Sequence, residues 1–167
     1  MTDNLFLTIV IGLLVVGWLA YRQLQWTGID RRSVWRSPIV LGGIGLVLLA
    51  QSSHGVAVGT VDIALIVVEA AVSLGLGLLM GRLTRFRTAA RPDRKGRVIE
   101  ARTGRAGAAL WIALIAVRVL MGVVGASLGA HLLESTGVIL LTIAVNRAAL
   151  ALVVDAKLPE EARVATR

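Results

Sequence analysis

The 167-residue chain contains no cysteine and few aromatic residues. The absence of thiols excludes a disulfide framework, a CxxC redox pair and a thiolate metal site. Phe, Trp and Tyr supply only 4% of the residues, so the apolar mass consists of Leu, Val, Ile, Ala and Gly, as in lipid-facing helices. The HExxH, P-loop and Ser-His-Asp patterns are also missing. These absences exclude the enzyme classes that those motifs define.

Hydrophobic residues dominate the chain. They make up 56% of it, and the mean hydropathy is +0.80, which is well above that of soluble domains. A helix needs about 20 apolar residues to cross a hydrocarbon core roughly 30 Å thick. We therefore predict an all-α, polytopic membrane helical bundle that forms a single domain over residues 1–167. Its five transmembrane helices are expected at residues 5–21, 38–51, 61–80, 106–130 and 137–154.

Basic residues fall on one side of the predicted membrane. Arginines follow the first and third helices, whereas the N-terminus and the loops after the second and fourth helices contain no Lys or Arg. The positive-inside rule then predicts an N-terminus outside and a C-terminus in the cytoplasm. We expect the basic face to meet a lipid bilayer with anionic headgroups. No nucleic acid is expected as a partner, because no aromatic residues are interleaved with the charge.

The basic segment between the third and fourth helices, residues 82–105, has turn chemistry at its centre. Pro92 precedes Asp93, and Gly96 closes the run. This spacing favours a cytoplasmic β-hairpin with strands at residues 84–89 and 97–102. A solvated loop without strands is the alternative.

Small residues recur at four-residue spacing on two predicted helices, and such rows let helix backbones approach closely in lipid. The pattern indicates a compact bundle, with a homodimer through one of the rows as the alternative. The first row comprises Ser73, Gly77 and Gly81, and the second Gly122, Ala126 and Ala130.

Ionisable residues inside the predicted helices are the candidate site. Glu69, Arg118 and the pair Asn146-Arg147 lie at similar depths when each helix is counted at 1.5 Å per residue. A charge at that depth costs at least ~2.5–3.5 kcal/mol, so we expect these side chains to face one another. Two arginines against one glutamate leave one positive charge, which pairs inside the bundle or receives an anion.

Three roles follow for these residues. In an ion-pair network, Glu69 contacts Arg118 or Arg147 and ties the helices together. In a ligand site, Arg118, Arg147 and Asn146 bind a hydrophobic, anionic small molecule. In an intramembrane enzyme, Glu69 and Asp62 are the catalytic acids. No metal site is predicted, because the two histidines, His54 and His131, have no carboxylate at ligand spacing.

Several of these segments resemble the CcdC-like family of small polytopic bacterial membrane proteins. The similar segments are the early Arg31-Arg32 to Pro38 stretch, the run Gly96 to Ile99 followed by Arg102, the helix from Trp111 to Arg118, and Arg147 in the last helix. The resemblance implies a multi-pass protein of the bacterial plasma membrane, from a family named for its proximity to cytochrome c maturation genes and without an established activity.

The sequence thus leaves three functions open and names no cofactor. The first is a membrane scaffold, assembly factor or ligand-binding protein. The second is an enzyme acting on an isoprenoid or lipid, such as a terpene cyclase, with a buried acid. The third is a small transporter that uses the same charged residues.

Overall fold

The computed structural model describes residues 17–18, 21, 24–52, 59–89, 91, 97–130, 132–133 and 135–158. They form four long helices, α2 (Arg31–Ser52), α3 (Thr60–Leu83), α4 (Gly104–Ser127) and α5 (Thr136–Lys157). Each of the four is long and apolar enough to cross a membrane. The helical fold is thereby confirmed for these segments. The first predicted helix, residues 5–21, falls almost entirely outside the described residues, as do His54 and His131.

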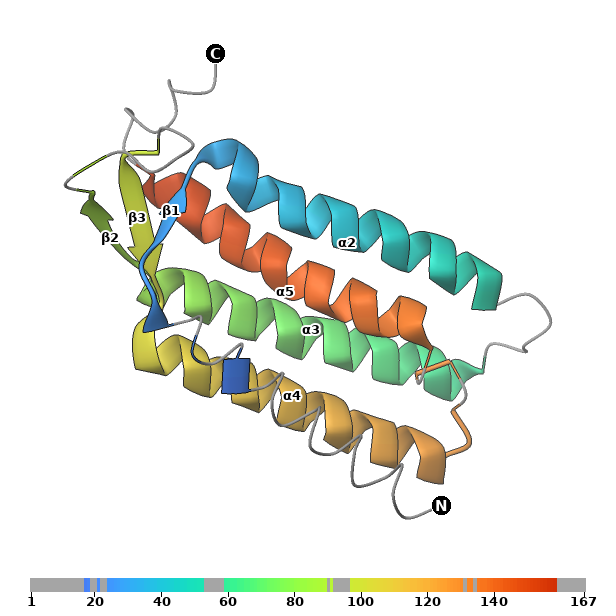
Figure 1. The fold of residues 1–167 in the computed structure, drawn as a ribbon. Coiled ribbons are helices and arrows are strands. Elements are labelled where there is room, and N and C mark those ends of the chain that lie inside the picture. The colour runs from blue at the N-terminus through green and yellow to red at the C-terminus, as the bar shows by residue number, and fades with distance from the viewer. Residues whose placement is uncertain are drawn as a thin grey trace, which may run out of the picture.

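The helices lie side by side in the order α2, α5, α3, α4 (Figure 1). The helix α5 packs against both α2 and α3, and α4 packs against α3. The helices α3 and α5 run in the same direction, and both end where a small sheet covers one end of the bundle (Figure 1). We refer to this end as the sheet end and to the other as the loop end.

The helix α2 differs from its prediction at the start. It begins at Arg31 rather than at residue 38, and Pro38 lies inside it. The first turn carries charge that the hydropathy pattern assigned to a loop, but it is held against α5. Arg31 forms an ion pair with Asp155 at 3.1 Å, and the Trp35 indole N–H donates to the same carboxylate at 3.3 Å.

The sheet has three antiparallel strands in the order β1-β3-β2. The predicted hairpin is present as β2 (Arg85–Thr88) and β3 (Ile99–Arg102), and Ala89 N–H donates to the Val98 carbonyl at 2.8 Å beyond the ladder. The third strand, β1 (Thr27–Ile29), pairs with β3 and was not predicted. The fold is therefore not purely α-helical. Ile99 of the sheet packs against Val154 and Leu158 near the end of α5.

The small-residue row of α3 contacts α5 directly. A Cβ at Gly77 would overlap the Asn146 carbonyl, and a Cβ at Gly81 would lie 2.6 Å from the Cβ of Val153. The close approach of backbones that the row predicted is confirmed within the chain. The row on α4 behaves differently, because Gly122 has nothing within 4 Å among the described residues.

Candidate functional site

The centre of the bundle contains a buried ion pair. The Arg118 Nη1 of α4 donates to Glu69 Oε2 of α3 at 3.0 Å, with the glutamate side chain only 1% exposed and the arginine 19%. Arg118 Nη2 also donates to the Leu133 carbonyl in the α4–α5 connection. The predicted contact between Glu69 and one of the two arginines is confirmed for Arg118. The charges of Glu69 and Arg118 therefore neutralise each other inside the bundle.

Three more polar side chains adjoin this pair at the α3–α5 contact, namely Ser73, Thr142 and Asn146, all of them buried. The Thr142 hydroxyl lies beside the Glu69 carboxylate. One turn nearer the sheet end, Asn146 Nδ2 donates to the Ser73 carbonyl at 3.0 Å. We call Glu69, Ser73, Arg118, Thr142 and Asn146 the buried polar cluster.

Asp62 lies near the loop end, away from the buried polar cluster. It is 4% exposed, its Oδ2 accepts the Gly59 N–H at 3.1 Å, and its Oδ1 accepts the Leu132 N–H at 3.0 Å. The carboxylate therefore satisfies the first turn of α3 and ties it to the α4–α5 connection. These two bonds indicate a structural role for Asp62, whereas the sequence suggested it as a catalytic acid.

Arg147 lies elsewhere than the sequence predicted. Its guanidinium stacks over the Trp111 ring of α4, with Cζ 4.9 Å from the ring centroid. Trp111 precedes Arg118 by about two turns, or ~10 Å along α4 at 1.5 Å per residue. Arg147 is thus displaced toward the sheet end, and the expectation that all the charges share one level is wrong.

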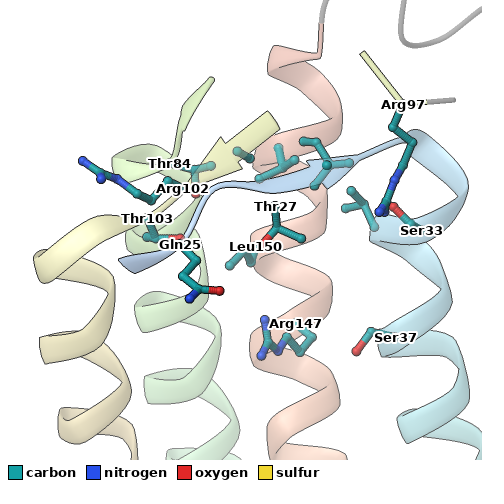
Figure 2. Close-up of a pocket in the computed structure, with 15 residues that line it drawn as sticks. Gln25, Thr27, Ser33, Ser37, Thr84, Arg97, Arg102, Thr103, Arg147 and Leu150 are labelled. Carbon is teal, nitrogen blue, oxygen red and sulfur yellow. The ribbon is translucent and has the colours of Figure 1, made fainter. Parts of the chain in front are cut away.

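A cavity of about 390 Å³ lies between the sheet and the helices at this level. Figure 2 shows Arg147 of α5 and Ser37 of α2 below the strand β1, with Gln25 extending toward the same space. Leu150 and Val154 supply an apolar wall on α5. We call this space the Arg147 cavity.

Positive charge dominates the Arg147 cavity. Its described lining residues include three arginines, Arg97, Arg102 and Arg147, and no Asp or Glu. Arg97 extends toward Ser33 at the α2 side, whereas Arg102 extends away from the cavity (Figure 2). The Arg102 guanidinium instead lies 4.9 Å from the centroid of the Trp26 ring. Hydroxyl groups add neutral hydrogen-bonding capacity to this lining. They come from Thr27 of β1, from Ser33 and Ser37 of α2, and from the cap residues Thr84 and Thr103.

The structure therefore separates residues that the sequence grouped together. Glu69, Arg118 and Asn146 belong to the buried polar cluster, while Arg147 alone reaches the cavity. Sequence reasoning missed Gln25, Ser37 and the stacking role of Trp111. Ser37 lies on α2 before the predicted helix start and Gln25 lies next to the unpredicted strand β1, so neither carried a periodic signal. Among the described residues, no three His, Cys, Asp or Glu side chains lie together as a metal site would require.

No protein-family model, curated protein or solved structure matches this chain. The resemblance to the CcdC-like family therefore stays a prediction.

Proposed function

We propose that this chain is a multi-pass protein of the bacterial plasma membrane that binds an anionic amphiphile in the Arg147 cavity. The sheet end, which carries the basic loops, lies in the cytoplasm. The membrane placement is supported by the four apolar helices, and the orientation by the one-sided distribution of Lys and Arg. The cavity then lies at the level where lipid headgroups meet the hydrocarbon.

The composition of the cavity lining supports this ligand class. Arg147 and Arg97 supply positive charge to the described lining, and Leu150 and Val154 offer apolar contact. A volume of about 390 Å³ lies within the roughly 300–1,000 Å³ of small-molecule sites. An arginine fork binds two oxygens of a phosphate or carboxylate, and the apolar wall accepts the first carbons of a chain. The position of Arg147 in a mixed polar and apolar cavity is the observation that carries the proposal.

The enzyme alternative has weaker geometric support. Glu69 lies in the buried polar cluster rather than in the cavity lining, and both oxygens of Asp62 accept backbone N–H groups. Neither acid is thereby placed against a ligand in the Arg147 cavity. We therefore prefer the binding function to the enzyme function. A scaffold or assembly factor could also use such a binding site.

The test compares Arg147→Met, Arg147→Lys and the unmodified protein. Native mass spectrometry would measure lipid retention after reconstitution with phosphatidylglycerol or with phosphatidylcholine, which differ in headgroup charge. We expect Arg147→Met to lose the preference for phosphatidylglycerol, since Arg147 is the described lining arginine that lies on α5 below the strand β1 (Figure 2). Arg147→Lys should retain part of it, because Lys keeps the charge but loses the planar fork.

The control for this test is Arg91→Met, which removes an exposed charge outside the cavity lining. It should leave the preference unchanged. Melting in detergent shows that each variant is folded, with a loss of only about 0.5–2 kcal/mol expected from the Arg147–Trp111 contact. An unchanged phosphatidylglycerol preference in folded Arg147→Met would contradict the proposal.

A further inference from the structure

The helix α2, at one edge of the row of helices (Figure 1), carries a second basic space apart from the Arg147 cavity. This space has a volume of about 830 Å³. Its lining comes from the first turns of α2 and comprises Arg31, Arg32, Trp35, Arg36, Ile39 and Val40. None of these six residues belongs to the described lining of the Arg147 cavity. We call this space the α2 groove.

One side of the α2 groove is held in place by α5. Asp155 forms the ion pair with Arg31 at 3.1 Å and accepts the Trp35 indole N–H at 3.3 Å. The carboxylate thus offsets the charge of Arg31 and fixes the Trp35 ring beside the groove. Because the indole N–H is used by this bond, the ring offers a ligand an apolar surface. This side of the groove is therefore formed before any ligand binds.

Arg32 and Arg36 supply the positive charge that is not offset. Both are exposed and lie one helical turn apart on the same face of α2. Gly45 of this helix contacts Leu141 of α5, and Arg36 precedes Gly45 by about two and a half turns, so Arg36 faces away from α5. Among the described residues, no carboxylate forms an ion pair with Arg32 or Arg36. Two guanidinium groups are thus accessible side by side.

The face that carries Arg36 becomes apolar toward the loop end. Val40, Ile44 and Val47 follow it and are exposed, and a Cβ at Gly43 would have nothing within 4 Å. In the membrane placement proposed above, these residues lie against hydrocarbon, while the arginines lie at the level of the headgroups. Charge followed by an apolar surface along one helix face is the order of groups in an anionic phospholipid.

The spacing of the two arginines selects among such lipids. Side chains one turn apart on a helix have Cβ atoms about 5–6 Å apart, so Arg32 and Arg36 can each bind one of two phosphates joined by a short bridge. The guanidinium fork suits the oxygens of a phosphate. A second copy of the chain fits this face less well, because docking through the same face would bring like charges together.

We propose that the α2 groove binds a lipid that carries two phosphates, of which cardiolipin is the common bacterial example. Arg32 and Arg36 each hold one phosphate, the Trp35 ring lies beside the headgroup, and the acyl chains follow Val40 and Val47. The α2 groove is a second lipid site, separate from the Arg147 cavity. The inference rests on the membrane placement proposed above but not on the ligand of that cavity.

Native mass spectrometry of the full chain tests this proposal, after release from phosphatidylcholine nanodiscs that contain a minor fraction of cardiolipin. The unmodified protein should retain cardiolipin. Arg32→Gln should lower the affinity for cardiolipin about fivefold, and the pair Arg32→Gln with Arg36→Gln about 30-fold, the effect of one basic contact each. The same pair should keep its preference for phosphatidylglycerol over phosphatidylcholine, because Arg147 is unchanged.

The matched control is the pair Arg82→Gln with Arg85→Gln. It removes two exposed charges from the same sheet end, outside both lipid sites, and should leave cardiolipin retention unchanged. Melting in detergent shows that each variant is folded. The proposal is overturned if the unmodified protein retains no cardiolipin, or if the two pairs lose cardiolipin equally. It is also overturned if cardiolipin is lost in Arg147→Met and kept in the Arg32 and Arg36 pair, which would assign this lipid to the Arg147 cavity.

Discussion

Individual charged residues in this bundle are stabilised in three different ways. Glu69 and Arg118 neutralise each other at 3.0 Å. Asp62 accepts two backbone N–H groups near the loop end. Arg147 stacks on the Trp111 ring and lines the cavity below the sheet. Of these three arrangements, the last places a guanidinium in the lining of a cavity, so the proposed function rests on Arg147 and not on the ion pair.

The ion pair gives a prediction at this scale. Arg118→Met leaves the 1% exposed Glu69 without its counter-charge, so the free energy of unfolding should fall by about 3–5 kcal/mol. Glu69→Gln should cost less, because Arg118 is 19% exposed and keeps the Leu133 carbonyl. The double variant should recover part of the summed loss. Denaturation in mixed micelles measures all four proteins, and strictly additive losses would show that the two charges are independent.

The sequence predicted that Glu69 pairs with Arg118 or Arg147, but it predicted neither which of the two forms the pair nor the position of Arg147. Counting residues from helix ends assumes that all helices begin at one plane and that each side chain stays at the level of its own Cα. An arginine side chain is long enough to reach toward either end of a helix. Helix rotation then decides that Asn146 faces α3 while Arg147 lines the cavity, and no residue count contains that rotation.

At the scale of elements, the parallel pair α3 and α5 forms the centre of the bundle. Gly77 and Gly81 bring the backbones close enough for side-chain atoms of one helix to touch the backbone of the other. That proximity also places Asn146 within bonding distance of the Ser73 carbonyl. Close packing and the buried polar cluster therefore depend on the same small residues.

Alanine substitutions at two glycines of α3 distinguish the effect of close packing from the effect of helix propensity. Gly77→Ala should destabilise the bundle by about 1–3 kcal/mol, as overpacking does, because its new Cβ meets the Asn146 carbonyl. Gly75→Ala lies on the same helix with nothing within 4 Å of its Cβ, so it should be neutral or slightly stabilising. Thermal melting in detergent compares them, and equal effects would mean that the α3–α5 contact is looser than the structure shows.

Elements were predictable where a long pattern supported them. Hydropathy located α3, α4 and α5, and turn chemistry located the β2–β3 hairpin. The strand β1 has only three residues, Thr27–Ile29, and forms because β3 offers a free edge, which is a tertiary cause. The first turns of α2 were missed because Arg31 and Arg36 look like loop residues in the sequence, and the ion pair between Arg31 and Asp155 of α5 exists only in the fold.

At the scale of the molecule, the sheet lies at one end of a row of apolar helices (Figure 1). Arg85 and Arg87 of β2, Arg102 of β3 and Arg31 of α2 all belong to this end. In an anionic leaflet a basic residue near the surface contributes about 1 kcal/mol of attraction, and less where a carboxylate offsets it, as Asp155 does for Arg31 and Glu100 does for Arg87. In the orientation that we propose, the same charges would concentrate anionic headgroups at the mouth of the Arg147 cavity.

The orientation yields the last prediction, and the absence of cysteine makes it direct. A single thiol placed at Thr136, the exposed first residue of α5 at the loop end, should react with a membrane-impermeant maleimide in intact cells. A thiol at Arg91, exposed at the sheet end, should react only after the membrane is opened, because the basic residues hold that end in the cytoplasm. Both variants change surface positions, so folding should be unaffected and labelling in detergent should be complete for each. Labelling of Arg91→Cys in intact cells would show that the sheet end faces outward. The Arg147 cavity would then open on the outer face of the membrane, and the argument from cytoplasmic anionic lipid would not apply.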